Sequence, residues 1–484
     1  MTPLIPWHTV DELLRPRISP TFTVDPLEDS AVEFTPYALL TDVGYLSVLL
    51  LLGKLVRAFL PFAQHMLLPS PITAGLLGII FGPAVLDIIP FSDQLTTYSS
   101  ILIAVVFAAL PFTMELSGTV AKNARTMWSY STGLYVIQWG LAILFGVLIL
   151  TPIFKTPEWL GVILPAGWVG GFGTAAAVGS AMDGPNENVV TTLGFTSATI
   201  GSLVAILGGV ILAKWGSQTH RTSQIGSYKE LPDEMRTGLI STIGQRPSIG
   251  RATSSASSLE SISLHLSLVI GSVLGAYLFN TWVASISEFS LPLFAMAFVV
   301  AFIVRLGMDL MNASNYVDKD TMNTVSGGAT DYLVAFGIAS IVPSIVVDYA
   351  LPLTILFVFG LILCLVTFRF LSPAMFGQAW FERGLFTWGW ATAAVSTGIA
   401  LLKIVDPRLK SGTMEDFGMA YVAYAPFEIA ITILAPTVVL AGFTLAFGWI
   451  TTAVALLVLI LPFILGWTKD HRKGGTPTTR GQEV

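Results

Sequence analysis

Cysteine and charge are both scarce in this sequence. The 484 residues include one cysteine, Cys364, so no intramolecular disulfide can form. Charged residues make up 11% of the chain, whereas soluble domains carry about 25%. This composition excludes an ordinary soluble globular protein, and the net charge of −6 argues against a nucleic-acid partner.

Signatures of catalysis are missing as well. The histidines are scattered without metal-binding spacing: His8, His65, His220, His265 and His471. We find neither a nucleotide-binding motif nor a nucleophile–base pair in the sequence. The sequence therefore favours neither a membrane-embedded enzyme nor a protein with a bound cofactor.

Apolar residues are what the sequence has in abundance, at 54% of the chain. A helix needs roughly 20 apolar residues to cross the hydrocarbon core of a bilayer. Runs of that kind predict spans near residues 38–60, 68–90, 96–117, 128–152, 190–214, 264–286, 291–311, 331–350, 352–371, 416–444 and 446–468. We therefore expect an all-α polytopic protein embedded in the lipid bilayer of the cell membrane.

The polar stretches predict which parts lie on which side of the membrane. Residues 215–262 form one long polar stretch with several basic residues and a serine run, and we interpret them as a cytoplasmic linker, with a regulatory role for the serines as the alternative. Residues 1–37 are acidic and proline-rich and predict a polar tail. The positive-inside rule then places the N-terminus outside and the 469–484 tail in the cytoplasm.

Two further apolar stretches, 159–182 and 374–402, do not fit this count as ordinary spans. The basic loops all fall on the cytoplasmic side only if each stretch enters and leaves the membrane on the same side. The positive-inside rule therefore predicts two re-entrant hairpins. The first contains GGFGTAAAVG, residues 170–179, a poor helix former. Irregular backbone survives at membrane depth where it lines a wet cavity or is buried in protein. A small-residue face between packed helices is the alternative.

The two halves of the chain resemble each other weakly. GGFGTAAAVGSAM aligns with TWGWATAAVSTGIAL around Thr174 and Thr392, and two upstream segments align in the same order. Each half, 38–214 and 263–445, then holds five spans and one hairpin. An odd number of spans predicts two inverted repeats, an architecture of secondary transporters. The span 446–468 has no counterpart and reads as an additional helix.

Several motifs carry a resemblance to the sodium/glutamate symporter family. They are GWVGGFGTAAAVGSAM, LGFTSATIGSLVAILGGVILAKW, GWATAAVSTGIALL, MAYVAYAPFEIAITILAP, LPSPITAGLLGIIFGP and ELPDEMRTGLI. The resemblance spans about residues 38–445. It implies a homodimer that moves a small anion such as L-glutamate with sodium as the coupling ion.

The sequence departs from that family in both hairpins. Phe172 stands where the family's first loop usually has a polar residue, and Ala175 replaces a glycine. The second loop is bulkier, more aromatic and poorer in glycine than the family's, with Leu385, Phe386, Trp388 and Trp390 in that region. The aromatic second loop leaves glutamate specificity open, so another organic anion and proton coupling remain alternatives.

The candidate ligands for sodium and substrate are bare backbone groups and hydroxyls. In the first hairpin, by match to the family motif, they are Gly170, Gly171, Gly173 and Thr174. In the second they are Thr387, Gly389, Thr392, Ser396 and Thr397. In the span after the first hairpin they are Thr196, Ser197 and Thr199. For each hydroxyl, the alternative is a bond to the carbonyl one turn back.

Ionisable residues inside apolar runs complete the candidates, because charge within a bilayer is costly. Glu428, beside Pro426, is the leading one, for cation coordination or proton binding, and a packing carboxylate held by hydroxyls is the alternative. Arg305 is expected to reach towards the interface. Asp348 and Glu115 lie near span ends, where solvation is expected. A channel is disfavoured because two hairpins are predicted rather than one continuous polar stripe.

Overall fold

The protein is almost entirely helical. Its computed structural model describes residues 35–65, 68–113, 124–184, 188–219, 221, 233–240, 242–286, 292–406 and 410–468. All regular elements within those ranges are helices. Nine helical segments there are long and apolar enough to cross a membrane: Pro36–Phe59, Leu95–Thr113, Ala124–Phe154, Val189–Gln218, Ser261–Ile286, Leu293–Leu310, Ala350–Phe376, Ala423–Leu440 and Thr444–Ile464. The predicted all-α, multi-pass fold is confirmed.

The long helices follow the predicted spans closely. They are α1 (Pro36–Phe59), α4 (Leu95–Thr113), α5 (Ala124–Phe145), α9 (Val189–Gln218), α11 (Ser261–Ile286), α12 (Leu293–Leu310), α15 (Ala350–Val366), α19 (Thr413–Leu440) and α20 (Thr444–Ile464). Short π-helical segments continue α5 into α6 (Thr151–Phe154) and α15 into α16 (Ser372–Phe376).

Two predicted spans differ in length from the helices that form. The stretch 68–90 contains α3 (Ser70–Phe81), of 12 residues, which ends at the extended residue Gly82. The stretch 331–350 is covered by α13 (Lys319–Ala339) and α14 (Pro343–Asp348). The N-cap of α13 is Asp318, whose side chain accepts a hydrogen bond from the Thr321 amide, so the helix begins well before the apolar run. Pro343 lacks an amide hydrogen and ends the continuous helix.

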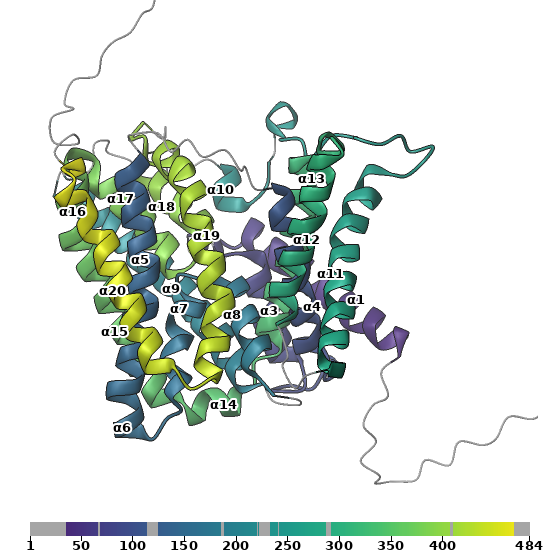
Figure 1. Ribbon diagram of the computed structural model, residues 1–484, viewed down its shortest axis with the longest axis horizontal. Helices are drawn as coiled ribbons and strands as arrows, with labels where there is room; N and C mark the ends of the chain where they lie inside the picture. Colours follow the sequence, from purple (N-terminus) through teal and green to yellow (C-terminus); the bar gives the residue numbers. More distant parts are fainter. Residues whose placement is uncertain are drawn as a thin grey trace, which may run out of the picture.

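The two special stretches are broken helices. Hairpin 1 consists of a 3₁₀ turn (Glu158–Val162), α7 (Ile163–Gly167) and α8 (Gly171–Met182). Hairpin 2 consists of α17 (Trp380–Thr392) and α18 (Val395–Val405). Hairpin 1 follows α6, at the bottom of Figure 1, and hairpin 2 follows α16, at the top. The two hairpins thus begin at opposite ends of the molecule.

The tips of the hairpins meet. Gly171 has a φ of +67°, and a Cβ at this position would lie 2.9 Å from the carbonyl oxygen of Ala393. Glycine alone adopts this conformation without a steric penalty and leaves room for that carbonyl. Within hairpin 2, a Cβ at Gly389 would lie 2.8 Å from the Cα of Gly398, so these glycines let α17 and α18 approach closely.

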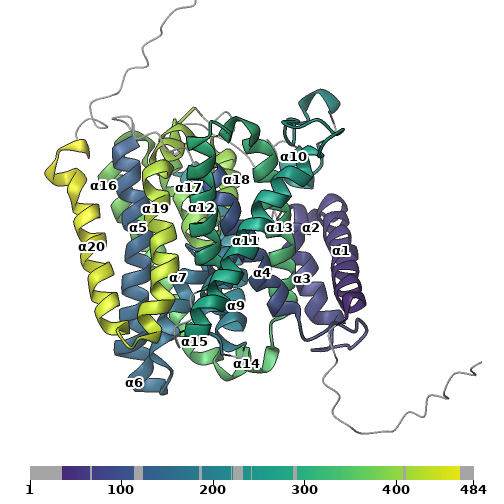
Figure 2. The same cartoon turned by 45° about the vertical axis from the view of Figure 1, so that its right-hand side comes forward.

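Two helical bodies lie side by side. The hairpin body shares one apolar core among α5, both hairpins, α9, α15 and α17–α20. The α4 body packs around α1, α3, α4 and α11–α13, and its core also includes Ala176 and Ala177 of α8 and Phe195 of α9. Figures 1 and 2 show α20 and α1 at opposite sides of the molecule. Between the bodies, a side chain at Gly337 on α13 would overlap the ring of Phe195 on α9.

Part of the predicted linker is ordered against the α4 body. It contains α10 (Asp233–Thr237), while residues 222–232 lie outside the described ranges. The Thr324 hydroxyl donates to the carbonyl of Ile249 (2.7 Å), and the amide of Arg251 donates to Asp318 (3.0 Å). The linker therefore contacts the first turns of α13. The inverted repeat and the domain boundaries stay predictions. Residues 1–34 of the predicted N-terminal tail and the whole tail 469–484 lie outside the described residues, while α1 begins at Pro36.

Candidate functional site

Two cavities lie between the bodies, at opposite ends of α4 and α13. Cavity A, of about 550 Å³, is lined by Ile103, Val106, Phe107, Leu110, Thr113, Gly170, Gly173, Thr174, Lys319, Asn323, Gly418, Tyr421, Ala425, Glu428, Ile429 and Thr432. Cavity B, of about 990 Å³, takes its lining from the start of α4, the end of α8 and residues 339–344. Both volumes are typical of small-molecule sites.

Cavity A gathers four of the predicted site residues. Gly170, Gly173 and Thr174 come from the tip of hairpin 1, and Glu428 comes from α19. Thr174 packs on Gly170, where a Cβ would lie 2.8 Å from the threonine Oγ1. A Cβ at Gly173 would meet only Ile103 Cδ1, at 3.5 Å. The glycines therefore leave the backbone at the start of α8 open to the cavity.

Glu428 is half-buried and surrounded by hydroxyl groups. The Tyr421 hydroxyl donates to its Oε2 at 3.4 Å. The Thr432 hydroxyl donates to the Glu428 carbonyl at 2.8 Å, and the Tyr135 hydroxyl lies 3.3 Å from the Thr432 hydroxyl. Within the described residues, no basic side chain forms an ion pair with Glu428. Cavity A therefore holds a carboxylate that makes no ion pair with a described residue, and the lining of the same cavity includes Lys319.

Several other predicted hydroxyls bond within their own helices. Each donates to the carbonyl four residues earlier: Thr196 to Thr192 (2.8 Å), Thr199 to Phe195 (2.8 Å), Thr387 to Arg383 (2.8 Å) and Thr392 to Trp388 (2.6 Å). Ser197 is buried against Gly167 of hairpin 1. The four threonines make the hydrogen bond that the sequence left open as the alternative, and neither they nor Ser197 line cavity A. Their contacts with sodium or substrate stay predictions.

Hairpin 2 is a buried aromatic unit rather than a cavity wall. Thr387, Gly389 and Thr392 are buried, and the Trp388 indole donates to the carbonyl of Ala205 at 3.1 Å. Thr397 is half-buried, and the side chain of Ser396 lies outside the description. The described lining of both cavities contains no residue of hairpin 2. Its predicted contacts with sodium or substrate stay predictions.

The sequence reading missed Gln138, a fully buried residue of α5. Its side-chain amide donates to the carbonyl of Ala391, and its oxygen accepts a hydrogen bond from the Val169 amide, both at 3.1 Å. Gln138 therefore connects the tips of both hairpins. An amide side chain within an apolar run was a usable signal, but the candidates named from the sequence were glycines, hydroxyls and ionisable residues.

Lys319 and Asn323 of cavity A were missed for a different reason. They belong to the polar first half of α13, which hydropathy placed outside the span. Among the other ionisable candidates, Arg305 pairs with Asp309 at 3.1 Å and Asp348 is exposed. Glu115 lies outside the described residues. Of the three that the structure describes, Glu428 is the one that lines a cavity.

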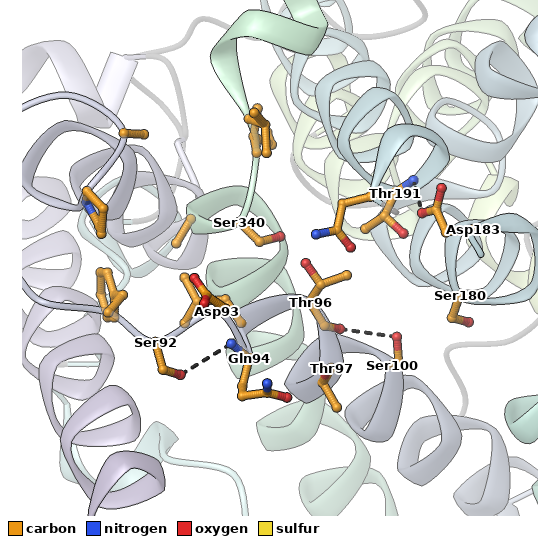
Figure 3. Close-up of a pocket in the computed structure, with 18 of the residues that line it drawn as sticks. Ser92, Asp93, Gln94, Thr96, Thr97, Ser100, Ser180, Asp183, Thr191 and Ser340 are labelled. Carbon is orange, nitrogen blue, oxygen red and sulfur yellow. Dashed lines mark hydrogen bonds between the residues drawn. The ribbon is translucent and has the colours of Figure 1, made fainter. Parts of the chain in front are cut away.

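Cavity B is polar, as Figure 3 shows. Ser92, Asp93, Gln94, Thr96, Thr97 and Ser100 lie on one wall, and Ser180, Asp183 and Thr191 lie on the other. Asp183 accepts hydrogen bonds from the amides of Val190 (2.7 Å) and Thr191 (2.8 Å), which caps α9. The 12-residue helix α8 has Gly173 and Thr174 at cavity A and Ser180 at cavity B.

This arrangement suits a protein that passes a solute between two bodies. Cavities A and B are lined by the same two bodies and by the same helix, α8. Broken helices supply bare amides and carbonyls where the hairpin tips meet, which is how many transporters bind ions and anions at membrane depth. The geometry therefore favours solute transport across the membrane.

Comparisons with known proteins give the family. The solved structure of the sodium proton antiporter MjNhaP1 from Methanocaldococcus jannaschii at pH 8 is similar over 85% of this chain and 99% of its own, at 17% identity and a TM-score of 0.35, too low to support an argument. No curated protein matches the sequence. The family model described as sodium/glutamate symporter matches residues 38–380. Because this match covers well over half of the sequence, the chain belongs to the sodium/glutamate symporter family.

Proposed function

We propose that the protein is a secondary active transporter that couples the uptake of glutamate or a related carboxylate to sodium. The observation that carries the proposal is cavity A, where the open backbone of hairpin 1 and Glu428 face one space between two bodies. Membership of the sodium/glutamate symporter family supports sodium as the coupling ion.

In this proposal, cavity A is the substrate site in one state of an alternating-access cycle, and cavity B marks the path to the other side. The hairpin body moves relative to the α4 body, so that the tip of hairpin 1 meets one side of the membrane at a time. The two bodies meet where the ring of Phe195 packs on Gly337, a contact that has to change when the bodies move. The predicted sodium and substrate ligands remain those named from the sequence, with Gly170, Gly173, Thr174 and Glu428 now facing one cavity.

Counterflow of labelled glutamate in proteoliposomes, with and without a sodium gradient, tests the proposal. We expect accumulation that depends on the sodium gradient. Uptake that follows a proton gradient instead, or uptake of another organic anion alone, would assign the protein to the alternative function in the same fold. Conductance without substrate coupling would favour a channel.

The predicted homodimer in the cell membrane belongs to the same proposal, and family membership is its only support. The full-length protein in detergent or nanodiscs should have the mass of two chains. A monodisperse monomer with full transport activity would contradict the dimer and leave the transport function intact.

A further inference from the structure

We propose that His265 and the linker hold the first turn of α13 in place and thereby position Lys319 and Asn323 in the wall of cavity A. Asp318, the N-cap residue of α13, is the point where these elements join. We define the α13 clamp as Asp318, His265 and linker residues 249–254. The effect of the clamp on uptake rests on the proposed transport function, whereas the clamp itself can be measured on the purified protein.

One side of the α13 clamp is the carboxylate of Asp318. Its Oδ2 accepts three hydrogen bonds: from the Thr321 amide at 2.8 Å, from the Thr321 hydroxyl at 2.8 Å and from the linker amide of Arg251 at 3.0 Å. A carboxylate at an N-cap satisfies a free helix amide and lies at the positive end of the helix dipole. Because the third donor is a linker amide, the oxygen that caps α13 also binds the linker.

The other side of the α13 clamp is His265, a fully buried residue of α11. Its Nε2 accepts a hydrogen bond from the backbone amide of Asp318 at 2.8 Å, so Nε2 carries no proton. The neutral ring therefore donates from Nδ1 to the Ser261 carbonyl oxygen, 2.7 Å away. The Ser261 hydroxyl accepts hydrogen bonds from the linker amides of Thr253 (2.9 Å) and Ser254 (3.2 Å). Helix α11 thus holds Asp318 and the linker together.

Two linker residues also lie directly on α13. The Thr324 hydroxyl donates to the carbonyl of Ile249 at 2.7 Å. Gly250 has a φ of +152°, and a side chain at this position would overlap the Thr321 hydroxyl. Glycine adopts this conformation without a steric penalty and lets the linker backbone come this close. With the amide of Arg251, three successive linker residues contact the first two turns of α13.

The buried residues of α13 are unevenly distributed along the helix. All residues from Leu333 to Ala339 are buried, whereas Thr321 and Met322 are the buried residues of the first half. That half has the sequence KDTMNTVSGGAT, in which serine, threonine and glycine are weak helix formers. The hydrogen bonds of the α13 clamp therefore supply contacts that the second half of the helix obtains from packing.

Cavity A depends on this clamped half of α13. Lys319 directly follows the N-cap, Asn323 lies one turn further along, and both line the cavity. Lys319 is the basic residue in the lining, so its position affects how strongly the cavity attracts an anion. Opening the clamp should therefore displace Lys319 and Asn323 and weaken anion binding from the end of the molecule that carries the linker, at the top of Figure 1.

Thiol labelling of the purified full-length protein tests the α13 clamp without transport. Asn323→Cys places an exposed thiol in the wall of cavity A, and the native Cys364 is buried. Thr324→Val in this background removes the donor to Ile249 and keeps the shape of the side chain. We expect a water-soluble maleimide to label the thiol several-fold faster, because a released helix turn opens more often.

His265→Leu removes the acceptor for the Asp318 amide and should raise the labelling rate further. His265→Gln, whose side-chain oxygen can accept the same hydrogen bond, should recover part of the original rate. Thr330→Val is the matched control for Thr324→Val, because the Thr330 hydroxyl donates within α13, to the Ser326 carbonyl at 2.8 Å. If His265→Leu does not fold, Thr324→Val decides the test alone.

Uptake by membrane vesicles of both orientations tests the positioning role. In saturating sodium, Thr324→Val and His265→Leu should raise the half-saturating concentration of labelled glutamate on the linker side about 3- to 10-fold, as the weakening of one hydrogen bond predicts. On the opposite side the half-saturating concentration should not change. A merely structural role would reduce the amount of folded protein and affect both sides alike.

An unchanged labelling rate in both variants would overturn the inference, and so would an equal rise in half-saturating concentration on the two sides of the membrane. Faster labelling in a protein without sodium-driven glutamate uptake would support the α13 clamp and contradict the proposed function. Sodium-driven uptake with unchanged labelling would do the reverse. The two proposals can therefore fail separately.

Discussion

The side-chain amide of Gln138 donates a hydrogen bond to the carbonyl oxygen of Ala391, 253 residues further along the chain, at 3.1 Å. Ala391 lies at the tip of hairpin 2, and the other end of the same amide accepts a hydrogen bond from Val169 at the tip of hairpin 1. One side chain of α5 thus fixes the tips of both hairpins relative to each other. Because all of these groups are buried, neither bond has water as an easy substitute.

Gln138→Leu should loosen both hairpin tips. The substitution keeps the approximate shape and leaves a carbonyl and an amide without partners, each costing about 1–3 kcal/mol. We expect a lower melting temperature and a loss of uptake, and Gln138→Glu should lose less because it still accepts from Val169. Gln218→Leu makes the same change at an exposed position and should have little effect on either measurement. Wild-type stability in Gln138→Leu would show that the bridge is dispensable.

Thr174→Val tests the hydroxyl at cavity A. If this oxygen is a sodium ligand, its loss should cost roughly 1–3 kcal/mol, or about 5- to 150-fold in affinity. We expect normal expression and a raised half-saturating sodium concentration in the uptake assay. Thr354→Val is the matched control, because Thr354 is exposed on α15 and its hydroxyl donates to the Ala350 carbonyl at 2.7 Å. Unchanged sodium dependence in Thr174→Val would contradict a ligand role and show that Thr174 only packs against its neighbours.

Gly171→Ala tests the contact between the hairpin tips. Its φ of +67° costs a residue with a side chain about 1–2 kcal/mol, and the new Cβ would lie 2.9 Å from the Ala393 carbonyl oxygen. Uptake should fall more than the amount of folded protein, measured by size-exclusion chromatography of the same membranes. Gly327→Ala, on α13, meets no atom within 4 Å and should leave both unchanged. Full uptake in Gly171→Ala would contradict a close approach of the two tips.

Ser223→Cys tests the predicted topology, with the linker and the C-terminus in the cytoplasm and the N-terminus outside. The native Cys364 is buried, so labelling should report the new position. We expect an impermeant thiol reagent to label Ser223→Cys in inverted vesicles and not in intact cells. Labelling of intact cells would reverse the orientation that the basic residues predict.

The sequence by itself was enough to determine the fold class and the places where the helices break. Apolar runs of bilayer length depend only on local composition, so they predicted most of the long helices within a few residues. The glycines around 170 and the small residues around 393 marked both hairpin tips for the same reason. Hydropathy did not predict that α13 begins at Lys319, because the first half of this helix is polar. The N-cap residue Asp318 is nevertheless visible in the sequence.

The composition of the site was decided by the tertiary structure. Thr174, Thr196, Thr199, Thr387 and Thr392 are equivalent as threonines in apolar segments, yet the last four donate to their own helices while Thr174 faces cavity A. Lys319 and Glu428 line one cavity although 109 positions separate them along the chain. Which hydroxyl turns inward, and which distant residues share a wall, depends on how the helices pack. Local sequence carries no record of that packing, so only the assembled bundle could show it.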